Sequence, residues 1–249
     1  MAYDGTRYAG FQVQPNAPTV QGELERALTE LCNEPVRITG AGRTDAGVHA
    51  TGQVINFRTA SALDGERIGR GVNALVPADI AISAVEPVGE DFHARYSATG
   101  RTYEYRIRNG PERHPLERHR EHWLPVPLDR SALDRATRLL HGRHDFAAFA
   151  AGEGGVREVR SATWSAQEEL LRFEITADAF LRGMVRAIVG TLLWVGRGRI
   201  GVEDFGALIE ARDRSKAGPS APANGLCLIS VEYGGRQRNT MRRNEDDEE

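Results

Sequence analysis

The clearest pattern along the chain is a strict alternation of residue types in the segment ATGRTYEYRIRNG. Tyr103, Tyr105 and Ile107 fall on one side of an extended backbone, because side chains on a strand alternate between its two faces. Arg106 and Arg108 fall on the opposite side. This period of two predicts a β-strand with one buried face and one polar face.

A helical period appears after Thr19, where Val20, Leu24 and Leu28 share one face and Thr19 is the predicted N-cap. Similar patterns predict further helices at 66–75, 131–140, 179–195 and 202–211. Strands are predicted at 36–40, 52–59, 80–88, 98–110 and 225–233, with two more near 160–177. Because strands and helices mix without strict βαβ repetition, we expect an α+β fold with a largely antiparallel sheet.

Length and composition are those of an ordinary globular protein. The chain has 249 residues, of which 40% are hydrophobic and 27% charged, enough for one large domain or two closely packed smaller ones. No apolar run approaches the roughly 18 to 20 residues that a membrane span needs, and the N-terminus lacks an export signature. We therefore expect a cytoplasmic protein with no membrane partner. The acidic end of the chain predicts a disordered tail at 236–249.

The charge pattern leaves nucleic-acid binding open. The net charge of −3 argues weakly against it, yet Lys216 is the only lysine among 32 basic residues. Arginine suits phosphate recognition because its planar fork of N–H donors matches phosphate oxygens. A GC-rich genome or a salt-adapted lineage would produce the same bias, so composition alone does not decide.

The cysteines and histidines do not predict a metal centre. Cys32 and Cys227 fall on apolar faces, which predicts two buried, reduced thiols rather than a disulfide. His114, His119 and His122 lie in a loop crowded with arginines, and the arginines would repel a cation. We expect neither a metal nor a cofactor.

The glycine-rich segment GAGRTDAGVHA places a single carboxylate, Asp45, among small residues. A dinucleotide cradle is disfavoured, because Asp45 occupies the third glycine position and a strand-like stretch follows instead of a helix. Nearby Arg43 would favour the ionised carboxylate, which could then act as a nucleophile or a base. An aspartate that caps its own turn fits this stretch equally well.

Six blocks of sequence together resemble one known family. GRTDAGVHA is similar to the active-site motif of the TruA-type tRNA pseudouridine synthases. The other blocks follow that family's order and are AYDGTRYAGFQVQPNAPTVQGELERAL, HARYSATGRTYEYRI, GRHDFAAF, DAFLRGMVRAIVG and APANGLCLISVEY. The resemblance covers nearly the whole chain except the C-terminal tail. It implies an isomerase that converts uridines at positions 38, 39 and 40 of the tRNA anticodon stem-loop to pseudouridine.

The resemblance also implies roles for particular residues. Asp45 matches the catalytic aspartate, and Tyr103 matches an active-site tyrosine that can stack on the target base or move a proton. Arg186 matches a basic residue that pairs with the aspartate. From the pattern alone, Tyr103 would be a core residue and Arg186 a solvated arginine on an amphipathic helix.

Substrate binding is expected at a further set of positions, which are Arg43, Arg58, Arg101, Arg182 and Leu226. The family's chemistry needs no metal or redox cofactor. Its members act as homodimers on tRNA, so we expect tRNA and a second copy of the chain as partners.

The implied fold consists of two α/β halves, 1–98 with the catalytic loop and 99–235, whose sheets join into one with the active-site cleft between them. The chain begins with only a stub of the family's first strand, so we expect that the native start lies upstream. FLRG replaces histidines that many members have before MVR. A non-catalytic RNA-binding protein on the same scaffold remains the alternative.

Overall fold

The computed structural model describes residues 1–234 and contains a central nine-stranded sheet. Its strands are β1 (Ala2–Tyr3), β3 (His49–Ala50), β5 (Ile80–Ala81), β6 (Ala98–Arg108), β7 (His122–Trp123), β8 (Gly142–Asp145), β9 (Val156–Gln167), β10 (Leu170–Ala177) and β11 (Leu226–Tyr233). A separate antiparallel pair consists of β2 (Ile38–Gly40) and β4 (Ile55–Phe57). The α-helices are α1 (Val20–Cys32), α2 (Gly65–Leu75), α3 (Arg130–Arg138), α4 (Met184–Gly196) and α5 (Val202–Ala211).

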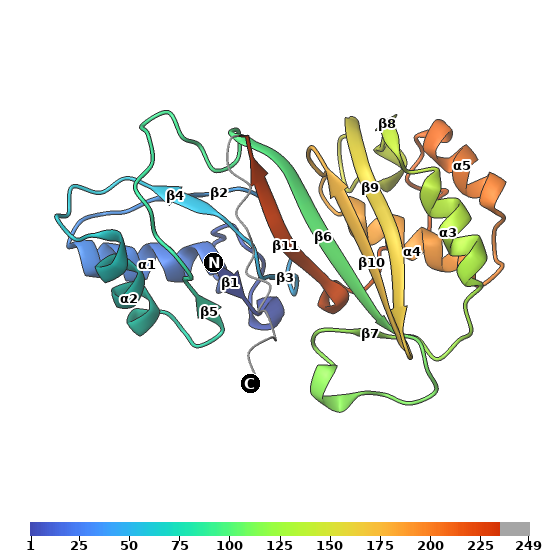
Figure 1. The fold of residues 1–249 in the computed structure, drawn as a ribbon, viewed down its shortest axis with the longest axis horizontal. Coiled ribbons are helices and arrows are strands. Elements are labelled where there is room, and N and C mark those ends of the chain that lie inside the picture. The colour runs from blue at the N-terminus through green and yellow to red at the C-terminus, as the bar shows by residue number, and fades with distance from the viewer. Residues whose placement is uncertain (235–249) are drawn as a thin grey trace, which may run out of the picture.

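The strand order along the main sheet is β5-β1-β3-β11-β6-β10-β9-β8, with β7 beside β6. The β3–β11 and β6–β7 pairs are parallel, and the others are antiparallel. The last strand, β11, therefore lies between β3 and β6. It joins the strands of residues 2–81 to those of residues 98–177. Helices α1 and α2 lie at one end of the molecule, and α3, α4 and α5 at the other (Figure 1). The expected α+β fold with one continuous, largely antiparallel sheet is confirmed.

Side-chain caps fix where several helices begin. The Thr19 hydroxyl accepts a hydrogen bond from the Gly22 backbone N–H, as the sequence predicts for the N-cap of α1. Asp64 caps α2 and Asp129 caps α3 in the same way. Each cap satisfies a backbone donor that the first helical turn leaves without a partner.

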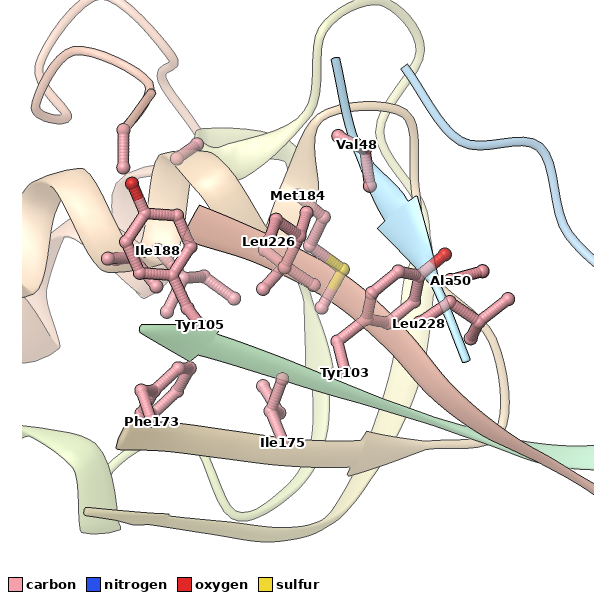
Figure 2. Close-up of a cluster of buried hydrophobic side chains, with 14 of the residues drawn as sticks. Val48, Ala50, Tyr103, Tyr105, Phe173, Ile175, Met184, Ile188, Leu226 and Leu228 are labelled. Carbon is pink, nitrogen blue, oxygen red and sulfur yellow. The ribbon is translucent and has the colours of Figure 1, made fainter. Parts of the chain in front are cut away.

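Strand β6 has the two faces that its alternation predicts. Tyr103, Tyr105 and Ile107 are buried, whereas Arg106 and Arg108 are only partly so. The buried face packs with β10, β11 and α4, and Figure 2 shows both tyrosines on the same side of β6 as the apolar side chains of β11. Tyr103 thus lies at the edge of a core that fixes its ring.

Several predicted elements are shorter than their patterns suggested, and the strand predicted at 52–59 spans only Ile55–Phe57. The strand predicted at 80–88 is limited to Ile80–Ala81, because its only partner, β1, consists of two residues. The helix predicted at 179–195 begins at Met184, because Gly183 has a left-handed backbone with φ of 69°. Residues 178–183 form a loop instead, and this loop borders the candidate site described below.

Both cysteines are free, as predicted, but they are half-buried rather than fully enclosed. No helix in residues 1–234 is long and apolar enough to cross a membrane. The tail predicted at 236–249 lies outside the described residues.

Candidate active site

Asp45 lies in the loop between β2 and β3, and the backbone of this loop is held from both sides. The Asp45 carbonyl accepts from the Val48 N–H (3.1 Å), and the Thr44 carbonyl accepts from the Phe11 N–H (3.1 Å). Gly47 adopts a φ of 76°, a conformation that costs a residue with a Cβ roughly 1–2 kcal/mol. Glycine therefore allows the turn that presents the Asp45 carboxylate.

Buried polar side chains anchor the residues before Asp45. The Tyr3 and Thr44 hydroxyls lie 2.8 Å apart and share a hydrogen bond. The Gln53 amide donates to the Gly42 carbonyl (2.9 Å), and the Gln53 side chain is fully buried. Because buried polar groups are costly when unpaired, these bonds favour one conformation of the loop.

Arg186 reaches Asp45 from the first turn of α4. Its Nη1 donates to Asp45 Oδ2 at 3.2 Å, and its Nε donates to the Ala221 carbonyl at 2.8 Å. The side chain of Arg186 is 23% exposed and that of Asp45 is 34% exposed. The ion pair predicted between these residues is therefore present, and the bond to Ala221 orients the guanidinium toward the carboxylate.

The Tyr103 phenol lies beside the loop that carries Asp45. A Cβ added to Gly42 would lie 3.8 Å from the Tyr103 hydroxyl, so the phenol borders the backbone of the Asp45 loop. Phe180 packs against the ring edge-to-face, with centroids 5.1 Å apart. Burial raises the pKa of the Tyr103 phenol, and the nearby Tyr3 and Asp45 raise it further. The phenol therefore keeps its proton at neutral pH and can donate a hydrogen bond.

The segment 221–223 also borders the site. Besides its bond to Arg186, it accepts a hydrogen bond from the Tyr105 hydroxyl at the Pro222 carbonyl (2.8 Å). A Cβ on Gly47 would lie 3.3 Å from the Ala223 Cβ. The segment thus contacts both the Asp45 loop and the arginine that pairs with it.

Comparison with known proteins identifies the family. The family model described as tRNA pseudouridine synthase matches residues 1–97 and 136–234, which is well over half of the chain. The chain belongs to the tRNA pseudouridine synthase family. Its relatives include the tRNA pseudouridine synthase A of Moorella thermoacetica, 47% identical over 239 residues that cover 94% of this chain and 97% of that protein.

Two further relatives carry the same name. The protein of Acetivibrio thermocellus is 44% identical and covers 93% of this chain and 96% of its own length. That of Chloroflexus aurantiacus is 47% identical and covers 94% and 87%. The chain thus spans almost the full length of these synthases.

The other predicted site residues of this family member have different environments. Arg43 and Arg182 are exposed, and the Arg43 Nη1 donates to Gln12 (2.9 Å). Arg58 donates to the Glu90 carbonyl and lines a surface cavity of about 460 Å³ whose lining does not include Asp45. Leu226 is buried and pairs with Tyr105 across the sheet.

Arg101 differs most from its predicted role. Its side chain is buried, and both terminal nitrogens donate to backbone carbonyls within the protein. These bonds occupy the N–H groups that a phosphate contact would use. The structure therefore brings together Asp45, Tyr103 and Arg186, but gives Arg101 internal partners.

Sequence reasoning missed the residues that support the site. Gln53 could have been recognised as a buried polar residue, since it lies inside the apolar stretch GQVINF. Tyr3 and Ala221 carry none, because a tyrosine in a strand and an alanine in a linker are both ordinary. No group of three or more potential metal ligands gathers anywhere in residues 1–234.

Proposed function

We propose that this chain isomerises uridine to pseudouridine in tRNA, at positions 38, 39 and 40 of the anticodon stem-loop. One observation carries the proposal: the Asp45 carboxylate, paired with Arg186, projects from a glycine-containing turn beside the Tyr103 phenol. The relatives named above are tRNA pseudouridine synthases, which supports the same substrate for this chain.

Asp45 is proposed as the catalytic carboxylate. Two routes fit a carboxylate at this position, attack on C1′ of the ribose or attack on C6 of the uracil. In both, Asp45 bonds to the attacked carbon, the C1′–N1 bond breaks, the base turns, a C1′–C5 bond forms, and the bond to Asp45 breaks to return the free carboxylate. The C5 proton leaves to solvent, and N1 gains a proton. Arg186 holds the carboxylate in one orientation, which is required for attack on a single atom.

Tyr103 and the small residues around Asp45 fit a base that has left its helix. Enzymes that act on a base within a nucleic acid extrude it and stack it against aromatic side chains. The Tyr103 ring provides such a surface, and its protonated hydroxyl can donate a hydrogen bond to the base. Gly47 and the exposed Ala46 leave space for a nucleotide beside the carboxylate.

The arrangement of the chain into two halves is also a proposal. We place the site in a cleft between 1–98 and 99–235, because Asp45 belongs to the first range and Tyr103 and Arg186 to the second. Arg43, Arg58 and Arg182 are proposed to contact RNA, with Leu226 supporting the pocket. We further propose a cytoplasmic homodimer. Sedimentation equilibrium at micromolar concentration tests the dimer, and a monomer mass would contradict it.

The catalytic assignment is tested with a tRNA transcript that carries tritium at uridine C5. Wild-type protein is expected to release tritium, because C5 loses its hydrogen as the new glycosidic bond forms. Asp45→Asn keeps the shape of the side chain and removes its charge, so release should fall below detection. Asp134→Asn, on the exposed surface of α3, is the matched control and should release tritium like wild type.

The same assay separates the alternatives. Release by Asp45→Asn at the wild-type rate would move the catalytic role to another residue. Absence of release by every form, with tRNA still bound in a filter assay, would favour the non-catalytic RNA-binding alternative.

A further inference from the structure

Arg101 makes four hydrogen bonds, and all four end on backbone carbonyls. Nη1 donates to Ala98 (3.1 Å) and Asp178 (2.8 Å). Nη2 donates to Ala41 (3.1 Å) and Arg95 (2.5 Å). The side chain is 8% exposed. A buried cation is costly unless polar groups compensate for its lost hydration, and here four carbonyl dipoles compensate.

The four carbonyls belong to segments that are far apart in sequence. Ala41 begins the loop that carries Asp45. Asp178 begins the loop that carries Phe180 and leads into α4 and Arg186. Arg95 belongs to the turn before β6, and Ala98 is the first residue of β6. The Arg101 side chain therefore connects the loop that carries Asp45 to the segment that leads into Arg186.

The connected loops have their own attachments, so a bond to their backbone restricts more than one residue. The Ala41 N–H donates to the Val54 carbonyl (2.8 Å). The Asp178 carboxylate accepts from the Glu158 N–H (3.0 Å). The guanidinium thus joins two segments that are each already fixed to the sheet or its neighbouring strands.

Arginine is the residue type that this position requires. Its terminal nitrogens carry four N–H donors in a fixed plane, and all four are used. A lysine would provide three donors around a single nitrogen and could not reach all four carbonyls. Methionine, of similar length, would leave every carbonyl without this partner.

We infer that Arg101 is a positioning residue that fixes the Asp45 loop relative to the Asp178–Arg186 segment, without contacting the substrate. This inference rests on the proposed function, since it concerns the rate of that reaction. It also replaces the RNA contact that the sequence suggested for this residue.

The experiment compares Arg101→Met with Arg138→Met under single-turnover and steady-state conditions, using tritium release from tRNA. Arg138 is the matched control because it is an exposed arginine on α3 and does not belong to the hydrogen-bond network of Arg101. A displacement of about 1 Å in a reacting group costs on the order of 100-fold in rate. Arg101→Met should lower kcat by about that factor, with KM and its salt dependence unchanged, whereas Arg138→Met should leave kcat unchanged.

An effect on KM instead of kcat would overturn the inference. If Arg101→Met raised KM and reduced the salt dependence of KM while kcat stayed at the wild-type value, Arg101 would be an RNA contact. A wild-type kcat and KM would also overturn it.

Arg101→Lys keeps the inference testable if Arg101→Met does not fold, as judged by circular dichroism. The lysine variant should lose less kcat than methionine, again at constant KM, and an unchanged kcat would count against the inference. Absence of tritium release by the wild-type protein would instead reject the proposed function itself, so the two failures are distinguishable.

Discussion

The two regions that supply the Asp45–Arg186 pair are held in place by different forces. Arg186 belongs to α4, in which eleven of thirteen residues are buried, so apolar packing positions the helix. Asp45 belongs to a loop whose position depends on hydrogen bonds from Tyr3, Gln53 and Arg101. The first region is specified by shape and volume, and the second by directed polar contacts.

This difference separates stability from activity. Loss of a packing contact in α4 lowers the free energy of unfolding, while the remaining contacts keep the helix in the same place. Loss of one polar contact to the loop costs little stability but leaves the Asp45 carboxylate free to move. Substitutions of the packing residues of α4 and of the polar residues that orient Asp45 should therefore have opposite effects on stability and on kcat.

After Asp45→Asn, the largest effect on activity is expected for Arg186→Met. The change removes the cation that orients Asp45, and loss of one preorganised electrostatic partner typically lowers kcat by roughly 100- to 1,000-fold. Because the ion pair is partly exposed, the midpoint of urea unfolding should change little. Single-turnover tritium release and a urea titration give both quantities. A wild-type rate would show that Asp45 acts without this partner.

Ile188→Ala, two residues further along α4, should show the reverse profile. Ile188 is fully buried, and such a truncation costs about 2–5 kcal/mol of stability. The kcat of the folded fraction should remain at the wild-type value. Urea unfolding measured beside tritium release at low temperature checks this. A large loss of kcat in fully folded protein would show that helix packing also sets the geometry of the pair.

Gly47→Ala probes the loop through its backbone. The positive φ costs alanine roughly 1–2 kcal/mol, and the added Cβ would lie 3.3 Å from the Ala223 Cβ. Stability should fall by about that amount, and kcat should fall as well, because the turn presents Asp45. Gly198→Ala is the control, since Gly198 has a similar φ of 66° with no atom within 4 Å of an added Cβ. Equal kcat values for the two variants would contradict a role for the turn.

Tyr3→Phe should have the smallest effect, about 1 kcal/mol at neutral pH from the lost hydrogen bond. Burial raises the pKa of Tyr3 from 10.0 to about 12. Below pH 10 the phenol is protonated in both states, and its contribution to stability is fully present. Between pH 10 and about 12 only the unfolded state loses the proton, so this contribution falls as pH rises.

Removal of the phenol removes that part of the pH dependence. The free energy of unfolding of Tyr3→Phe should decline less steeply with pH above 10 than that of wild type. Urea titrations across the alkaline range measure both slopes. Identical slopes would mean that the Tyr3 phenol titrates alike in the folded and unfolded states.

The parts of the fold that were predictable from sequence depend on local periodicity. The alternation in β6 and the capped pattern of α1 each determine their element within one stretch of residues, and both formed where expected. The strand predicted at 80–88 failed because the length of a strand depends on its partner, and β1 lies nearly eighty residues away. Periodicity carries no information about that partner.

The residues of the site also fall into a group that the sequence predicts and a group that it does not. The motif around Asp45 and the resemblance to a family supplied Asp45, Tyr103 and Arg186, and the structure places them together. Their support was not visible, because the contacts of Gln53 with Gly42 and of Arg101 with Ala41 join residues that only the folded chain brings close. Arg101 was predicted to bind substrate because the sequence does not show whether an arginine is buried or exposed.

The position of β11 in the sheet has a consequence for synthesis. Translation proceeds from the N-terminus, so β3 and β6 leave the ribosome long before residues 226–233 do. Until then no strand occupies the place between β3 and β6, and the Ala221 carbonyl that orients Arg186 has emerged only shortly before. The hydrogen bond that orients Arg186 toward Asp45 can therefore form only after the chain has been synthesised beyond residue 221.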